Sequence, residues 1–141
     1  MIRFSNRRLT SAQAAQLLAL YRQTFWAADR ALADVKRMLK HTPLMISAWD
    51  GKNLVGYARV LTDFTYRASL YDVMVDDHYQ GRGIGLKIMQ RLQNHPKLRR
   101  ITSWYLKTRD THEFYEKLGW KRDPTGFMQL RTIPKLRRRR R

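Results

Sequence analysis

The sequence predicts one mixed α/β domain, built on a twisted sheet of six or seven strands with helices on both faces. Two observations support this fold class. Apolar runs rich in β-branched residues are interspersed with amphipathic helical stretches, in the order β-α-α-β-β-β-α-β-α-β-β. The chain also has 141 residues and 43% hydrophobic content, which suffices for one domain with a substantial core, and no repeat or linker divides it.

The first half should supply a strand, two helices and three further strands. Thr10 starts the first helix, with Gln13 placed to complete a capping box, and the second helix covers about residues 28–40. Residues with helical spacing should face inward: Ala14, Leu17, Leu18, Tyr21 and Phe25 in the first helix, and Leu32, Val35 and Leu39 in the second. The strands are expected at residues 2–4, 44–49, 54–61 and 68–75, with a hairpin turn at 50–53.

The second half should begin with a helix that opens at the glycine-rich segment 81–85. Its apolar face is expected to consist of Ile84, Ile88, Met89 and Leu92. A strand at 101–106 follows. Asp110 and Glu113 then resemble an N-cap pair for a short helix that Gly119 terminates. The last two strands are expected at 120–122 and 127–133.

The composition restricts the classes of function. The chain has no cysteine, which excludes disulfides, thiolate metal sites and cysteine nucleophiles, and no metal is expected. No stretch is long and apolar enough to span a bilayer, and the N-terminus lacks the apolar core of a signal peptide. We therefore expect a soluble cytoplasmic protein.

The chain is strongly basic, with a formal net charge of +18. Residues 135–141 supply six of these charges, so residues 1–134 are basic as well. We expect residues 1–134 to form the domain and residues 135–141 to be a flexible basic tail. Basic surfaces attract polyanions such as nucleic acid, but a solvated tail explains the charge of the last residues equally well.

Residues 73–89, VMVDDHYQGRGIGLKIM, hold the most informative pattern. An apolar run ends in acidic residues, and Gln-Gly-Arg-Gly-Ile-Gly at 80–85 leads into an amphipathic helix. This order of strand, glycine loop and helix forms a phosphate cradle from main-chain N–H groups. The dinucleotide-binding and Walker A patterns are absent. A second motif, Phe-Tyr-Glu-Lys-Leu-Gly-Trp, follows at 114–120.

The two motifs resemble the Q/R-x-x-G-x-G/A loop and the F-Y-x-x-x-G-F segment of the GNAT superfamily of acetyl-CoA-dependent N-acetyltransferases, with Trp120 replacing the usual Phe. Residues 24–27 with Arg30, residues 55–63 and residues 108–112 are similar to a bacterial and cyanobacterial subgroup that has no single agreed substrate. The resemblance covers the chain up to about residue 133 and implies the GNAT fold, with a mainly antiparallel sheet.

The resemblance also implies where acetyl-CoA binds. Main-chain N–H groups from Arg82 to Gly85 would neutralise the pyrophosphate, with the side chains of Gln80 and Arg82 as additional donors. Arg82 as an exposed loop cation is the alternative. The main chain of the preceding strand would pair with pantetheine and donate to the thioester carbonyl. The implied cofactor residues are Val73, Met74, Val75, Gln80, Gly81, Arg82, Gly83, Ile84, Gly85 and Thr108, the last in place of a frequent Asn.

Two residues are candidates for moving protons. Tyr115 matches the family tyrosine that protonates the departing thiolate, and a buried structural tyrosine is the alternative. Asp72 is the predicted base, because a carboxylate in an apolar strand is costly unless it is functional or paired; an ion pair with Arg59 explains it equally well. Trp26 is predicted to line the acceptor site. Asp63 is interpreted mainly as a turn residue, with a substrate contact as the second interpretation.

The resemblance thus implies transfer of an acetyl group from acetyl-CoA to a primary amine. A small-molecule amine, amino acid or aromatic amine is favoured over a protein, since a basic enzyme repels lysine-rich peptides. The alternative is a non-catalytic protein on the same scaffold that binds nucleic acid or another polyanion through its basic surface and tail. A homodimer is compatible with the family, in which dimers are common, and no membrane contact is expected.

Overall fold

The structure is a computed structural model, and it describes residues 1–124, 130 and 131. The chain forms two compact units, Met1–Leu106 and Lys107–Arg141, which are described separately. The basic tail at 135–141 lies outside the described residues, as does most of the strand expected at 127–133. Within the described residues, no helix is long and apolar enough to cross a membrane.

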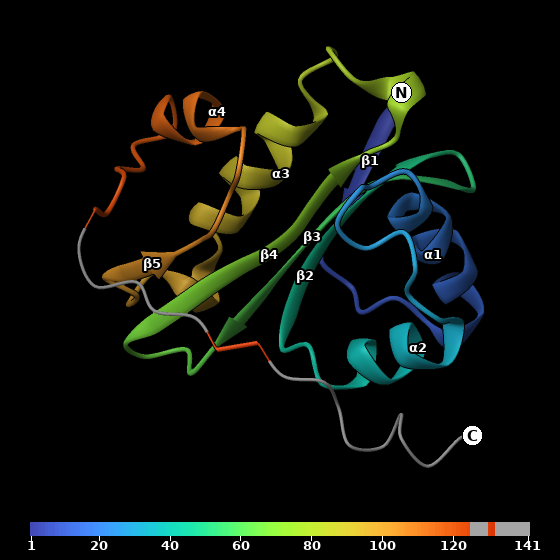
Figure 1. Cartoon of the computed structure of the whole chain (residues 1–141), viewed down its shortest axis with the longest axis horizontal. Helices are drawn as coiled ribbons and strands as arrows, with labels where there is room; N and C mark the ends of the chain where they lie inside the picture. Colours follow the sequence, from blue (N-terminus) through green and yellow to red (C-terminus); the bar gives the residue numbers. More distant parts are fainter. Residues whose placement is uncertain (125–129, 132–141) are drawn as a thin grey trace. The chain divides into compact units, whose positions relative to one another are not determined.

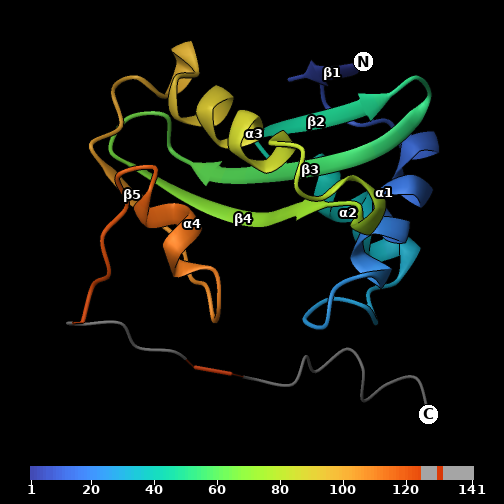
Figure 2. The ribbon, with the colours of Figure 1, turned by 90° about the horizontal axis from the view of Figure 1, so that it is seen from above.

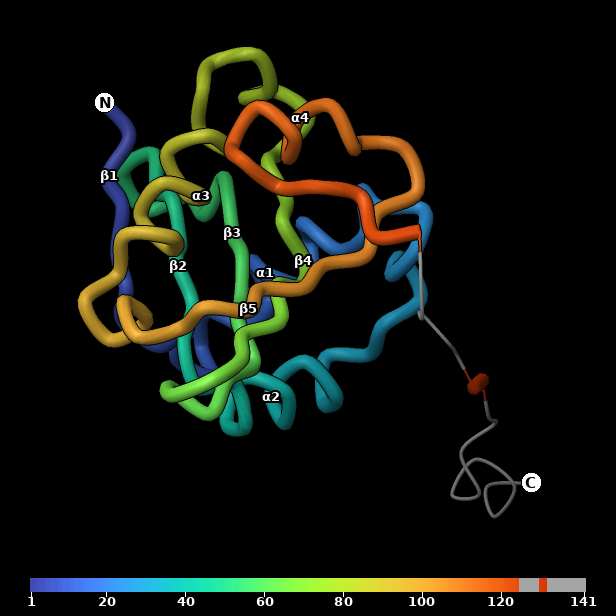
Figure 3. Tube along the Cα trace, turned by 90° about the vertical axis from the view of Figure 1, so that its left-hand side faces the viewer, coloured from blue at the N-terminus to red at the C-terminus, as the bar shows by residue number. Residues whose placement is uncertain are grey.

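A five-stranded sheet forms the centre of the first unit (Figure 1). In spatial order, which is also chain order, the strands are β1 (Ile2–Ser5), β2 (Leu44–Asp50), β3 (Asn53–Thr62), β4 (Arg67–Val75) and β5 (Ser103–Tyr105). The pairs β1–β2, β2–β3 and β3–β4 are antiparallel, whereas β5 runs parallel to β4. The strand β1 therefore lies at one edge of the sheet, next to β2 (Figure 3).

Helices cover both faces of this sheet (Figure 2). The helices α1 (Ala14–Arg22) and α2 (Leu32–Lys40) lie on one face, and α3 (Ile84–Gln93) lies on the other. The predicted capping box is present in the 3-10 turn before α1, where Thr10 and Gln13 exchange side-chain and main-chain hydrogen bonds. The predicted apolar face of α3 is also confirmed, because Ile84, Ile88, Met89 and Leu92 are all buried.

A hydrophobic core lies between the sheet and the helices α1 and α2. Its buried residues come from both helices and from β2, β3 and β4, and include Leu17, Tyr21, Val35, Leu39, Met45, Trp49, Tyr57 and Met74. Burial of such large apolar side chains is the dominant stabilising contribution in a fold of this size.

The second unit contains the short helix α4 (His112–Glu116). Its C-terminus is a Schellman motif: the Trp120 N–H donates to the Tyr115 carbonyl, and the Gly119 N–H donates to the Glu116 carbonyl. The Tyr115 ring makes edge contacts with Phe114 and Trp120, at centroid distances of 5.0 and 6.1 Å. The motif at 114–120 is therefore a helix end that gathers three aromatic rings.

Several sequence-based expectations were wrong. The described sheet has five strands rather than six or seven, and residues 120–122 are not a strand. The second helix begins at Leu32 rather than residue 28, and both Phe25 and Leu32 are exposed. Thr111, not Asp110, caps α4, without a side-chain hydrogen bond. The differences at the second helix and at α4 fall at the ends of elements, where propensity signals are weakest, whereas at 120–122 a whole short strand is absent.

Candidate functional site

The strand β4 carries a β-bulge. The pairing register with β3 shifts between Tyr57 and Arg59, so Ala58 faces two residues of β4, Asp72 and Val73. Asp72 has a φ of 57°, which is uncommon for a residue with a side chain. A bulge bends a strand and re-aims side chains, and bulges are frequent next to functional sites. Here the re-aimed side chain is that of Asp72.

Near the bulge, one edge of β4 has no strand partner among the described residues. The strand β5 pairs only with Arg67–Ser69. The Asp76 N–H donates to the Val55 carbonyl of β3 at 2.8 Å. Because main-chain groups alternate between the two edges of a strand, the N–H groups of Val73 and Val75 point away from β3. This edge can pair with an extended ligand.

The loop at 80–85 leads from β4 into α3. Gly81 and Gly83 have φ values of 78° and 77°, a region that strains any residue with a Cβ, and Gly83 is the N-cap of α3. The Lys87 N–H donates to the Gly83 carbonyl at 3.1 Å, which closes the first helical turn. The N–H groups of residues 84–86 precede this bond and have no acceptor within the helix. Such free N–H groups at the positive end of a helix dipole are of the kind that bind anions in proteins.

The side chains of the loop mainly hold its shape. The Gln80 amide donates to the Val75 carbonyl and to the Asp77 carboxylate, each at 3.3 Å. The Arg82 guanidinium donates to the His78 carbonyl at 3.2 Å. Both predicted side-chain donors thus bond to residues 75–78, which precede the loop.

Asp72 is the centre of a cluster of side chains on the α1–α2 face of the sheet, which we call the Asp72 cluster. Its Oδ2 accepts hydrogen bonds from the Tyr21 hydroxyl at 2.6 Å, Arg59 Nε at 2.6 Å and Arg30 Nη1 at 3.0 Å. The side chain of Asp72 is only 5% exposed, against 12% for Arg59 and 31% for Arg30. The ion pair with Arg59 that was one explanation of Asp72 is therefore present.

This environment keeps Asp72 ionised. Burial would raise the pKa of its carboxyl group, but the charge of Arg59, the Tyr21 hydrogen bond and Arg30 outweigh burial and hold that pKa below its usual range. Burial and the Asp72 charge raise the pKa of Tyr21, which remains a hydrogen-bond donor. A carboxylate with a lowered pKa is a weak proton acceptor and a stable fixed charge.

Aromatic rings flank the two arginines. The Arg30 guanidinium carbon lies 4.4 Å from the Tyr21 ring centroid and 5.8 Å from that of Trp26, and the Arg59 guanidinium carbon lies 5.2 Å from that of Tyr71. Trp26 is 44% exposed and Tyr71 is 43% exposed. Trp26, which was predicted to line an acceptor site, thus lies beside the Asp72 cluster.

Asp63 does not lie in this cluster. Its Oδ1 accepts the N–H groups of Thr65, Tyr66 and Arg67, at 2.9, 2.8 and 3.1 Å. These bonds lower the pKa of Asp63 and shape the turn before β4, at the opposite end of the strand from the glycine loop. The structure therefore shows Asp63 as a turn residue.

The remaining predicted residues belong to the second unit. The Thr108 hydroxyl lies 2.6 Å from the Thr111 hydroxyl and accepts the Thr111 N–H at 3.2 Å. Burial raises the pKa of Tyr115 to about 12, so its hydroxyl is protonated at neutral pH. Their roles toward a cofactor remain predictions.

Sequence reasoning missed the partners that complete the site. Tyr21 was placed on the core face of the first helix, and Arg30 was noted only as part of a family segment. Gln23 was not singled out, although its amide donates to Asp76 at 3.1 Å and its oxygen accepts the Asp77 N–H at 2.9 Å, which ties the loop to the end of α1. Of these residues, only Arg30 could have been found from the sequence, because it belongs to the segment that resembles the bacterial and cyanobacterial subgroup.

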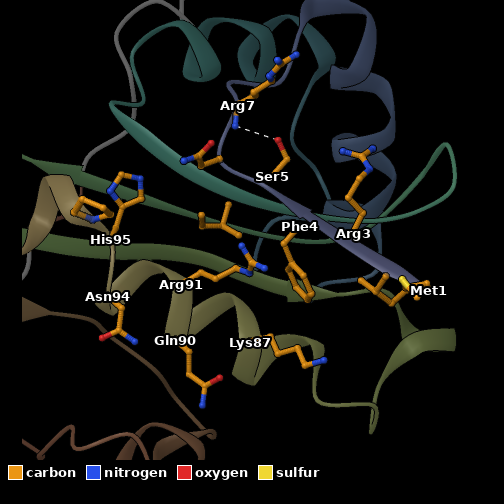
Figure 4. A pocket seen from close by; sticks show the side chains of 14 residues that line it. Met1, Arg3, Phe4, Ser5, Arg7, Lys87, Gln90, Arg91, Asn94 and His95 are labelled. Carbon is orange, nitrogen blue, oxygen red and sulfur yellow. Dashed lines mark hydrogen bonds between the residues drawn. The ribbon is translucent and has the colours of Figure 1, made fainter.

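A groove of about 990 Å³ lies between β1 and α3 (Figure 4). Arg3 and Arg7 line one side and Lys87 and Arg91 the other, and no lining residue is acidic. The Arg91 guanidinium lies over the Phe4 ring at 4.9 Å. None of the predicted site residues lines this groove. Among the described residues, no group of three or more His, Cys, Asp or Glu side chains could hold a metal.

Comparison with known proteins places the chain in a family. Residues 42–122 match the family model of the acetyltransferase (GNAT) domain. The uncharacterized N-acetyltransferase ycf52 of Porphyra purpurea is 32% identical over 111 residues, which cover 75% of this chain and 64% of that protein. The chloroplastic GCN5-related N-acetyltransferase 2 of Arabidopsis thaliana is 34% identical over 85 residues, which cover 60% of this chain and 33% of that protein. The chain thus spans less than two thirds of these relatives.

The solved structures agree with this result. A GNAT-family protein from Xanthomonas campestris pv. campestris has a TM-score of 0.81 and 29% identity, with 96% of each chain covered. The residues matched by the family model, 42–122, include the bulged strand β4, the glycine loop and α4. Because this match covers more than half of the sequence, the chain belongs to the GNAT acetyltransferase family.

Proposed function

We propose that the protein transfers the acetyl group of acetyl-CoA to a primary amine. The observation that carries this proposal is the loop at 80–85, in which Gly81 and Gly83 adopt left-handed conformations at the N-terminus of α3, one 3-10 turn after a bulged strand. The relatives named N-acetyltransferases support the same reaction.

The loop and strand fit the two ends of acetyl-CoA. Nothing lies within 4 Å of the position that a Cβ of Gly83 would occupy, which leaves space for a pyrophosphate against the N–H groups of residues 84–86. The N–H groups of Val73 and Val75 would pair with pantetheine and with the thioester carbonyl. Met74 has its side chain in the core, so it would contribute its main chain only.

The proposed reaction needs two proton transfers. Acetyl-CoA supplies an activated acyl group: the amine nitrogen bonds to the thioester carbon, the C–S bond breaks, and the thiolate leaves with the electron pair. The neutral amine loses one proton once the C–N bond has formed, and the thiolate gains one; an acceptor that binds as ammonium first gives a further proton to solvent. We assign the donor role to Tyr115, whose hydroxyl is protonated at neutral pH. Asp72 is paired and has a lowered pKa, so we assign it to acceptor binding and the amine proton to solvent.

A thermal shift experiment tests cofactor binding directly. Acetyl-CoA should raise Tm by several degrees at saturation, and plain CoA and ADP should show what the acetyl and pantetheine parts add. Amines would then be screened by release of the CoA thiol. No shift with any of the three ligands would overturn the proposal, because the loop would then not bind a pyrophosphate.

As a second and separate function we propose binding of a polyanion such as nucleic acid in the basic groove between β1 and α3. Arg3, Arg7, Lys87 and Arg91 form no ion pair among the described residues. Binding by charge should weaken steeply with salt, and replacing Arg3 and Arg91 by Gln should reduce the slope. Deletion of residues 135–141 distinguishes the groove from the tail. Absence of duplex DNA binding at low salt would exclude this function.

A further inference from the structure

We propose that the acceptor amine also carries a carboxylate, as an amino acid does, and that the Asp72 cluster binds both groups. This inference rests on the acetyl transfer proposed above and adds the substrate class that the site selects. It also assigns Arg30 as a specificity-determining residue, with Trp26 and Tyr71 as contacts for the rest of the acceptor.

The charge of the cluster favours an anionic group over a second cation. Two guanidinium groups, those of Arg30 and Arg59, share one carboxylate, so the cluster has a net charge of +1. Asp76, the next acidic residue along the chain, is occupied by Gln23 and by the His78 N–H. A polyamine would therefore meet a positive potential, whereas an acceptor with a carboxylate is attracted.

The atoms left over in the cluster match the two ends of a zwitterion. All three hydrogen bonds to Asp72 go to Oδ2, and Oδ1 has no partner among the described residues. The Nη atoms of Arg59 and the Nη2 atom of Arg30 are likewise unbonded there. No buried side-chain nitrogen or oxygen in the described residues lacks a partner, so these free atoms reach solvent. Oδ1 can accept from an ammonium group while the guanidinium groups donate to a carboxylate.

The exposed aromatic residues at the edge of the Asp72 cluster indicate which chemical group the rest of the acceptor carries. Trp26 and Tyr71 each expose nearly half of their surface, on the Arg30 side and the Arg59 side of Asp72 respectively. Exposed aromatic rings next to a buried charged cluster form contact surface for an apolar or aromatic group. An aromatic amino acid therefore combines all the features that the cluster can bind.

A matched set of three acceptors tests the inference: L-phenylalanine, its amide, and phenethylamine, which lacks the carboxylate. Thiol release should give a kcat/KM for L-phenylalanine at least about tenfold above that for either analogue. Arg30→Gln should collapse this ratio through a higher KM for L-phenylalanine. Arg30 is partly exposed and is one of three donors to Asp72, so the variant should fold, which circular dichroism would check. The control is Arg37→Gln, an exposed arginine of α2, which should preserve the ratio.

Direct binding separates a failure of this inference from a failure of the proposed function. Ligand-observed NMR in the presence of CoA measures acceptor binding without turnover. Equal kcat/KM values for the three acceptors would overturn the inference while leaving acetyl transfer intact. If no amine is acetylated, the transfer function fails, and preferential binding of L-phenylalanine that is lost in Arg30→Gln would still support the site. Equal or absent binding of the three ligands would overturn it.

Discussion

The glycine loop and the Asp72 cluster lie at successive positions along one segment of chain, yet they are built in opposite ways. The loop uses main-chain groups from a few consecutive residues, and its shape depends on Gly81 and Gly83. The cluster uses side chains from α1, the α1–α2 segment, β3 and β4, which meet at a single carboxylate oxygen. Loop chemistry is therefore local, whereas the cluster exists only when the fold is complete and every partner is present.

The largest expected effect is on the cluster. Asp72→Asn removes the carboxylate that Arg30 and Arg59 share, which leaves their positive charge uncompensated in the cluster. Breaking a buried ion pair from one side costs about 3 kcal/mol or more in the free energy of unfolding. Urea unfolding of the variant and the natural protein measures this loss.

A second variant shows whether the loss comes from the unpaired arginine. In Asp72→Asn with Arg59→Met, the buried charge is gone as well, so the double variant should be more stable than Asp72→Asn alone. If the two losses simply add, the ion pair does not contribute to stability and the cluster is not a cooperative unit.

The second effect concerns the loop and has a matched control. Gly83 and Gly51 both have positive φ, at 77° and 58°, and nothing lies within 4 Å of either Cβ position. Replacing either residue by Ala should destabilise the fold by about 1 kcal/mol through backbone strain. Only Gly83→Ala should also weaken acetyl-CoA binding, by roughly 100-fold, because it displaces the N–H groups of the helix N-terminus.

Calorimetry with acetyl-CoA would measure the two affinities. The same affinity in Gly83→Ala and Gly51→Ala would show that the loop is a structural turn and that the cofactor binds elsewhere.

The difference in construction explains what could be predicted from the sequence. The loop was predicted because the positions of Gly81 and Gly83 record a main-chain requirement, and the apolar face of α3 follows from periodicity alone. Asp72 was flagged because a carboxylate is costly in an apolar strand, and Arg59 was named as a partner because it was expected on the adjacent strand. Tyr21 could not be assigned, since its spacing is equally that of a core residue.

The errors in the predicted fold have a related cause. Phe25 continues the helical spacing of α1, but the helix ends at Arg22, so the periodicity predicted a burial that does not occur. The bulge at Asp72 had no signal of its own, because it depends on the pairing of β4 with β3. The bulge, which is set by the long-range register between β3 and β4, therefore remained beyond sequence reasoning.

The third effect concerns Tyr115, which we propose as the proton donor to the departing thiolate. Tyr115→Phe should lower kcat by about tenfold or more while leaving acetyl-CoA affinity nearly unchanged, since only the proton donor is lost. Single-turnover kinetics together with calorimetry separate these two quantities. An unchanged kcat would assign protonation of the thiolate to solvent.

The last effect is the pH dependence of the stability that Asp72 contributes, and it follows from the sign of the Asp72 pKa shift. The pKa of Asp72 in the folded protein lies below its unfolded value of roughly 3.9, because Arg59, Tyr21 and Arg30 outweigh burial. Its contribution to stability is therefore complete above that unfolded value and is lost as pH falls through the folded pKa. Tyr21 has a raised pKa and is protonated in both states throughout the acid range, so it adds nothing there.

The natural protein and Asp72→Asn should thus differ most in free energy of unfolding near neutral pH, and the gap should begin to narrow below about pH 4 and close as pH falls through the folded pKa of Asp72. All other titrating groups are common to the two proteins, so the gap isolates Asp72. Urea unfolding of both proteins between about pH 7 and about pH 3 measures it. A gap that stayed constant down to the acid limit would mean that the Asp72 charge does not stabilise the fold. The loss in Asp72→Asn would then come from the convergence of three donors on Oδ2, which an amide does not reproduce, and the two arginines would be balanced by solvent instead.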